Sequence, residues 1–123
     1  ELLQTTLIDT RGGKPNYGKA GSEKIVYEIC GTPWNLVNGA GTDPVEMQIG
    51  RYIAILCMGL LTRGMPGIYI NGLIAATNYE PEGGLDEART LNRESFDVQS
   101  LCDELDEGNN HKSRVFEIVM DIT

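Results

Sequence analysis

Residues 43–71, DPVEMQIGRYIAILCMGLLTRGMPGIYIN, decide which fold the rest of the chain is expected to adopt. Asp43 is a good helix N-cap, Pro44 suits the first helical position, and Glu46 stands where a capping-box acid reaches back to the cap. Apolar side chains follow at helical spacing and cover most of the circumference. We therefore predict a helix over Asp43–Arg63 that is largely buried.

The end of this helix and the segment after it indicate an α/β fold. Gly64 is a good helix stop, and Pro66 cannot continue the helix. Residues 68–70, IYI, are too short and too rich in β-branched side chains for another helix, so we expect a short strand there. A helix next to a short strand is half of an α/β unit, in which helices cover buried parallel strands.

Length and composition are those of one modest globular domain. The 123 residues are 41% apolar. The longest apolar run, Tyr52–Leu61, is about half of the roughly 20 residues that span a bilayer. The N-terminus has no basic-then-apolar signal pattern, so nothing points to a membrane or to export.

Cysteine usage favours an intracellular protein without a metal. The cysteines are odd in number, widely spaced and without a C-x-x-C pair; they are Cys30, Cys57 and Cys102. This pattern favours free thiols in a reducing cytoplasm over a disulfide framework or a zinc site. We expect no metal or other cofactor.

The net charge of −8 comes from one acidic run. Between Glu80 and Glu107 there are ten acidic residues and two bases, Arg89 and Arg93, and the rest of the chain is neutral. Because an acidic surface repels phosphate backbones, we expect no nucleic-acid partner. We interpret most of this run as a solvated helix surface.

The remaining segments alternate between loops and short regular elements. Before the central helix we expect a helix end over Glu1–Asp9, with a strand also possible, an exposed loop over Lys14–Lys24, an extended segment over Ile25–Cys30 and an irregular stretch over Gly31–Thr42. After the expected strand we expect a long loop over Leu73–Asn92, a helix capped by Ser95 and ended by Gly108-Asn109, and a last helix from His111. The long irregular region before the central helix is typical of a functional loop or excursion.

Two patterns resemble nucleotide or ion sites without meeting their requirements. Gly13–Ala20 nearly matches the P-loop G-x-x-x-x-G-K-[ST], but Ala20 stands where a hydroxyl must reach Mg²⁺. Asp106–Glu117 has the spacing of a calcium loop, but His111 occupies the position that needs glycine. We interpret the second pattern as a helix-helix connection and His111, the one histidine, as a surface residue.

The segment Arg89–Arg93, RTLNR, is the best candidate for ligand binding. Two arginines four apart, with Asn92 between them, lie in an expected loop after the expected strand. The forked donors of arginine suit sugar hydroxyls, carboxylates or phosphate. The same arginines also suit neutralisation of the surrounding acids, and composition alone favours neither role.

Five segments, in this order, resemble the sucrose-phosphorylase subfamily of the α-amylase family, glycoside hydrolase family 13. They are Tyr27-Glu28-Ile29, the long apolar helix, Gly64–Ile70, Asn78-Tyr79 and Arg89–Glu94. The resemblance runs over essentially the whole chain, and Tyr-Glu at positions 27 and 28 is closer to the glucosylglycerate and glucosylglycerol phosphorylase branch than to the sucrose-specific members. It implies an α/β fold, the C-terminal part of a (β/α)8 TIM barrel.

The resemblance assigns a place in this partial barrel to each part of residues 1–123. Residues 14–42 would be the excursion between the seventh strand and seventh helix, and residues 43–71 the seventh helix and, at Gly67–Asn71, the eighth strand. Residues 72–94 would be the loop over the active-site face, and residues 95–123 the closing helices. The upstream barrel segment would be needed to complete the fold.

The resemblance also implies a site and a reaction. Arg89 would hold the donor glucose, with Asn92 and Arg93 in the same substrate-binding loop, and Tyr27 and Glu28 would line the acceptor and phosphate side. The reaction would be reversible phosphorolysis of an α-glucoside with retention, in which a small sugar substrate and inorganic phosphate give α-glucose 1-phosphate. Family members carry their catalytic carboxylates upstream of this region, so no catalytic residue is expected here.

The chain departs from the family pattern in the loop after Glu28. Cys30 stands where members usually have Asn, and residues 31–34, GTPW, replace a more regular run, so acceptor contacts in this loop differ from the family pattern. Two other functions remain open. One is an independent, non-catalytic acidic interaction module derived from the barrel, and the other is an amylase-like hydrolase.

Overall fold

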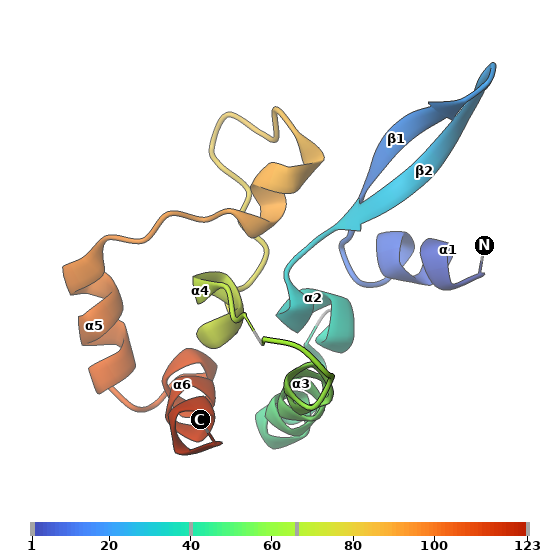
Figure 1. Ribbon diagram of the computed structural model, residues 1–123. Coiled ribbons are helices and arrows are strands. Elements are labelled where there is room, and N and C mark those ends of the chain that lie inside the picture. The colour runs from blue at the N-terminus through green and yellow to red at the C-terminus, as the bar shows by residue number, and fades with distance from the viewer. Residues whose placement is uncertain (1, 40, 66, 123) are drawn as a thin grey trace.

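The chain combines an N-terminal β-hairpin with a group of helices. A computed structural model describes residues 2–39, 41–65 and 67–122. The elements in order are α1 (Leu2–Asp9), β1 (Lys14–Ala20), β2 (Glu23–Cys30), α2 (Pro33–Asn38), α3 (Val45–Leu60), α4 (Ile70–Leu73), the 3-10 helix η1 (Ala88–Asn92), α5 (Val98–Asp106) and α6 (His111–Ile122). Figure 1 shows α2, α3, α4 and α6 gathered together, with the hairpin extending away from them.

The hairpin corrects the loop expected over Lys14–Lys24. Strands β1 and β2 pair antiparallel, from Lys14 opposite Cys30 to Ala20 opposite Glu23. Gly21, with φ of 66°, makes the turn between them. Turn-forming residues in β1 are held in a strand because β2, which contains the predicted extended segment, supplies the hydrogen-bonding partner. The paired strand over Lys14–Ala20 also leaves no loop there to wrap a phosphate.

Helix α2 lies inside the stretch that the sequence predicted to be irregular. Thr32 caps it by accepting a hydrogen bond on its hydroxyl from the Asn35 N–H at 3.4 Å. Pro33 stands in the first turn, and Gly39 ends the helix with φ of 63°. The prediction of irregular structure was wrong. The helix has only six residues, too few for a periodic apolar pattern to mark it in the sequence.

Helix α3 confirms the central helix but corrects its capping. The N-cap is Pro44, and no side chain caps it. The Asp43 carboxylate instead accepts a hydrogen bond from Arg51 Nη1 at 2.7 Å, and Glu46 forms a two-pronged ion pair with Arg114 of α6. Both carboxylates therefore bind arginine side chains and do not cap the N-terminus of the helix, because an arginine lies within reach of each of them.

The same helix is much less buried than predicted. Its buried residues are Gln48, Ile49 and Tyr52. Met58 is 69% exposed, and Leu61, directly after the helix, is 85% exposed. Described elements pack on one face of α3, so the apolar side chains on the remaining circumference meet no covering layer within the described chain.

The strand expected over Gly67–Asn71 is absent from this structure. Ile70–Leu73 form the short helix α4, and the Tyr69 carbonyl accepts hydrogen bonds from Gly72 N–H at 2.8 Å and Leu73 N–H at 2.9 Å. A strand needs a neighbour for its backbone groups, and the described strands β1 and β2 pair with each other. Pro66, the expected helix breaker, lies outside the described residues. The resulting fold is mixed α and β with a two-stranded sheet.

The core lies among the helices. Its buried members come from α2, α3, the segment after α4, and α6; they are Trp34, Ile49, Tyr52, Ala75, Val115 and Val119. The Tyr52 hydroxyl donates to the Gly72 carbonyl, and burial raises the pKa of Tyr52 to about 12. His111 packs beside Trp34 and is half-buried, so its prediction as a surface residue was wrong.

The C-terminal helices follow the sequence with one change of cap. Asp97, and not Ser95, caps α5 by accepting from the Ser100 N–H at 2.9 Å, a bond that lowers the pKa of Asp97. Helix α6 begins at His111 as predicted. Helix α1 confirms the predicted helix over its described residues. Within the described residues, no helix is long and apolar enough to cross a membrane.

Candidate functional site

An ion pair between β2 and η1 brings together two of the residues predicted to bind substrate. Arg89 Nε donates to Glu28 Oε2 at 2.9 Å, although the two residues stand 61 positions apart. Hydrogen bonds from Asn16 and then from Arg89 hold the pKa of the Glu28 carboxyl below its ordinary value. Glu28 is therefore a carboxylate whose Oε2 atom is held by two donors, Asn16 and Arg89.

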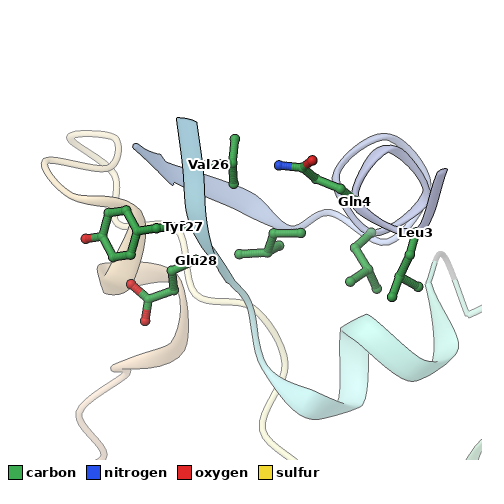
Figure 2. A pocket seen from close by; sticks show the side chains of 7 residues that line it. Leu3, Gln4, Val26, Tyr27 and Glu28 are labelled. Carbon is green, nitrogen blue, oxygen red and sulfur yellow. The ribbon is translucent and has the colours of Figure 1, made fainter. Parts of the chain in front are cut away.

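A β-bulge places Tyr27 next to Glu28 at this site. Asn16 pairs with Glu28 and Tyr17 pairs with Val26, so Tyr27 has no partner residue on β1. A bulge of this kind breaks the strict alternation of side chains along a strand. Figure 2 shows Tyr27 and Glu28 projecting to the same side of β2, while Leu3 and Gln4 of α1 lie on the other side.

Tyr27 stands between two open hollows on the hairpin. One hollow, of about 400 Å³, lies between α1 and β2 and is also lined by Glu28 (Figure 2). The other, of about 510 Å³, lies between the hairpin and the start of η1 and is lined by Asn16 and Arg89. A side chain at Gly18 would place its Cβ 3.2 Å from Cδ1 of Tyr27, so the glycine leaves room for the ring on β1.

Two groups at the ion pair remain open for a ligand. The hydrogen bonds that Asn16 and Arg89 donate to Glu28 both end on Oε2. Within the described residues, no amide or guanidinium group donates to Oε1, and no acceptor meets Nη1 or Nη2 of Arg89. The pair thus presents one carboxylate acceptor and several guanidinium donors, a combination that suits hydroxyl and oxyanion groups.

Helix η1 fixes the position of Arg89 through a buried neighbour. Leu91 is fully buried, and its carbonyl accepts a hydrogen bond from the Tyr79 N–H at 2.8 Å. The next residue in the chain, Asn92, lines a hollow beside α3, and its Oδ1 is buried without a partner among the described residues. Arg93 is exposed and forms no ion pair with any residue described. The structure therefore groups Tyr27, Glu28 and Arg89, and it leaves Asn92 and Arg93 apart from that cluster.

Asn78 ties the loop before η1 to the base of the hairpin. Its Oδ1 accepts from the Thr32 N–H at 2.8 Å, and its Nδ2 donates to the Gly12 carbonyl at 3.1 Å. Its own N–H donates to Asn35 Oδ1 at 2.8 Å. The Asn78-Tyr79 pair, one of the segments that carry the family resemblance, therefore connects the parts of the chain that hold Glu28 and Arg89.

Sequence reasoning missed Asn16. This residue lies in β1, in the segment predicted to be a loop, and its Nδ2 donates to Glu28 Oε2 at 2.8 Å and to Cys30 Sγ at 3.4 Å. Cys30 is buried, and burial raises the pKa of its thiol. No local pattern marks Asn16, because its contacts come from strand pairing.

The described residues contain no cluster of three or more histidine, cysteine or acidic side chains able to hold a metal ion. The sequence between Asp106 and Glu117 instead forms the α5–α6 connection and part of α6, as expected. Glu104 pairs with Lys112 at 2.9 Å across this connection.

Comparison with known proteins relates the chain to one kind of enzyme. It is 29% identical over 98 residues to a glucosylglycerate phosphorylase of Allomeiothermus silvanus, which is 76% of this chain and 17% of that protein. It is 25% identical over 119 residues to a glucosylglycerate phosphorylase of Spirochaeta thermophila, which is 94% of this chain and 20% of that protein. The chain thus spans about one fifth of the length of the curated relatives it matches. No family model and no solved structure matches it.

Proposed function

We propose that this chain is the C-terminal barrel segment of a retaining α-glucoside phosphorylase that acts on glucosylglycerate or a related small glucoside. The similarity to two glucosylglycerate phosphorylases supports the proposal and agrees with the resemblance in the sequence. Those proteins are about five times longer than the matched region, so in this proposal the activity would belong to a larger parent protein. Its substrates would be the glucoside and inorganic phosphate, and its product α-glucose 1-phosphate.

The observation that carries the proposal is the Arg89–Glu28 ion pair. The family resemblance assigns Arg89 to the donor glucose and Glu28, with Tyr27, to the acceptor and phosphate side. The 2.9 Å contact places the two residues side by side, as adjoining donor and acceptor subsites would. Oε1 of Glu28 can accept a hydrogen bond from a hydroxyl of the molecule in the acceptor subsite. The remaining guanidinium donors of Arg89 suit glucose hydroxyls or phosphate oxygens.

The chemical step would use carboxylates from outside this chain. Retaining enzymes of this kind use two carboxyl groups about 5 Å apart, one as nucleophile and one as acid and base. The contribution of this chain would be to hold the sugar against those groups, and positioning of this kind lowers the barrier by removing the entropy of encounter. Asn92 and Arg93 would complete the substrate-binding loop once the remaining barrel segments surround it.

A partial barrel of this kind would account for the uncovered apolar surface beside α3. Met58 and Leu61 would pack against the upstream barrel segment, and Gly67–Asn71 would become the eighth strand when a neighbouring strand accepts its hydrogen bonds. The free thiols of Cys30, Cys57 and Cys102 suit a cytoplasmic enzyme.

One observation favours the alternative of an independent interaction module. The core around Trp34, Tyr52 and Val115 is built within the chain, from α2, α3 and α6. A module of this kind would fold by itself and would present the acidic run between Glu80 and Glu107 to its partner.

Expression of the complete reading frame that encodes this chain tests the proposal. Purified protein is incubated with inorganic phosphate and glucosylglycerate, glucosylglycerol or sucrose, and α-glucose 1-phosphate is measured. We expect the highest kcat/KM with glucosylglycerate or glucosylglycerol. Release of free glucose without α-glucose 1-phosphate would make the protein a hydrolase, and a reading frame that encodes only this chain and releases neither product would favour the module.

A further inference from the structure

We infer that Asn16 is a positioning residue that selects the acceptor by orienting the Glu28 carboxylate. The inference rests on the proposed function, because it gives Glu28 a role toward the acceptor. Asn16 belongs to no motif in the sequence and stands in β1, outside the segments that carry the family resemblance. Its role follows from its place opposite Glu28 in the hairpin.

The side-chain amide nitrogen of Asn16 has two hydrogen-bond partners. Nδ2 donates to Glu28 Oε2 at 2.8 Å and contacts Cys30 Sγ at 3.4 Å. An amide nitrogen carries two hydrogens, so it can serve both partners at once. Cys30 is buried, and therefore the sulfur is a fixed point against which the amide, and through it the carboxylate, is oriented.

Asn16 and Arg89 together determine which oxygen of Glu28 faces a ligand. Both donate to Oε2, so rotation of the carboxylate would break two hydrogen bonds. Oε1 is then the acceptor presented at the site. Without Asn16, the carboxylate loses one of the two donors that hold Oε2 and keeps only Arg89 and the Cys30 thiol as side-chain partners, so it can turn more freely.

The bulge makes this orientation matter for specificity. Asn16 and Glu28 are the last paired residues before the unpaired Tyr27, so the amide holds β2 at the point where the strand changes direction. Tyr27 and Asn16 also line the same hollow as Arg89. An acceptor in this hollow would meet the ring of Tyr27 beside the ion pair that Arg89 forms with Glu28.

Two variants of Asn16 and one control test the inference in the protein encoded by the complete reading frame. Asn16→Ala removes the donor, Asn16→Asp keeps the shape and replaces the donor with an acceptor, and Asn109→Ala changes an exposed asparagine on the connection between α5 and α6. The first readout is the ¹³C chemical shift of the Glu28 carboxyl during an acid titration. The second is the ratio of kcat/KM for phosphorolysis of glucosylglycerate to that of sucrose.

We expect both Asn16 variants to raise the midpoint of the Glu28 titration and to lower the glucosylglycerate-to-sucrose ratio by roughly tenfold or more, since a mismatched polar contact discriminates on this scale. Asn109→Ala should leave both readouts unchanged. An unchanged Glu28 midpoint overturns the positioning role, and a moved midpoint with an unchanged ratio overturns the selecting role. Absence of phosphorolysis in the unaltered protein overturns the proposed function and with it the selecting role, while the Glu28 midpoint separately decides whether Asn16 orients the carboxylate.

Discussion

The imidazole of His111 stacks on the indole of Trp34, with ring centroids 4.3 Å apart and planes inclined by 22°. The Nε2 atom of the same ring lies 3.1 Å from the Ala75 carbonyl. The half-buried His111 is thus packed against two members of the core, Trp34 and Ala75. The single histidine of the chain is thus a packing residue, and its protonation is coupled to folding.

Stability should fall as the pH drops below about 6.5, the ordinary pKa of histidine in an unfolded chain. Burial lowers the pKa of folded His111, and this effect outweighs the hydrogen bond with the Ala75 carbonyl, which acts in the opposite direction. The folded state therefore binds the proton at a lower pH than the unfolded state does. The contribution of His111 to the free energy of unfolding is fully present above the unfolded pKa and is lost as the pH falls through the folded pKa. Thermal unfolding monitored by circular dichroism between about pH 7.5 and about pH 5.5 measures the change.

The matched control for this prediction is His111→Gln, whose thermal midpoint should be independent of pH over the same interval. The pKa values of Glu28, Glu46 and Asp97 are lowered, so these carboxyl groups stay ionised there. An equal pH response in the unaltered chain and in the variant would assign the effect to another group.

Arg89→Lys should lower kcat/KM for phosphorolysis by the parent enzyme far more than Arg93→Lys does. A lysine ammonium cannot both replace the Nε bond to Glu28 and offer a planar fork to the ligand. Misplacement of a bound group by about 1 Å can cost on the order of 10²-fold in rate. Steady-state kinetics of both variants decide the matter, and small, equal effects would indicate that the two arginines merely neutralise nearby acids.

Glu28→Gln should lower the ratio of kcat/KM for glucosylated polyols and hydroxy acids to kcat/KM for sucrose in the parent enzyme. A carboxylate accepts hydrogen bonds only, whereas an amide both donates and accepts, so the pattern of hydroxyls that the site can satisfy changes. The ion pair with Arg89 is also lost. The measurement compares kcat/KM of the unaltered enzyme and of the variant for glucosylglycerate, glucosylglycerol and sucrose. A parent enzyme that prefers sucrose, together with a variant of the same preference, would contradict the prediction.

The isolated chain of 123 residues should self-associate. Large apolar side chains on and beside α3 are uncovered, among them Met58 at 69% and Leu61 at 85% exposure. Size-exclusion chromatography at increasing concentration measures the effect, and Met58→Lys should shift the equilibrium toward the monomer. A compact monomer with a cooperative thermal transition at all concentrations would instead favour the independent module.

Leu91→Ala should destabilise the isolated chain by about 2–5 kcal/mol, the usual cost of removing a fully buried leucine side chain. Leu91 has no exposed surface and anchors η1 below Arg89. Leu2→Ala is the matched control, because its side chain is 83% exposed and substitutions at such positions change stability by about 0.5 kcal/mol or less. Urea unfolding of both variants gives the two values, and equal losses would show that η1 contributes nothing to stability.

Local patterns were sufficient for the helices that carry a long periodic face. Apolar spacing predicted α3 and α6, and the pair of arginines in Arg89–Arg93 marked the segment that forms η1 as a candidate for ligand binding. These features can be predicted locally because helical hydrogen bonds join residues four apart, so each segment contains its own partners. Helix α1 and the extended segment in β2 were predicted for similar local reasons.

Tertiary structure alone decided the hairpin, the state of Gly67–Asn71 and the site. Residues of β1 have turn-forming character, and they become a strand because β2 lies opposite; Gly67–Asn71 has strand character, and it remains unpaired because no described strand lies beside it. The contact of Glu28 with Arg89, 61 positions away, and the bulge that turns Tyr27 toward the same side are likewise invisible to local patterns. Strand pairing and ion pairs depend on which distant segments meet, and that is determined by packing of the whole chain and not by the order of neighbouring residues.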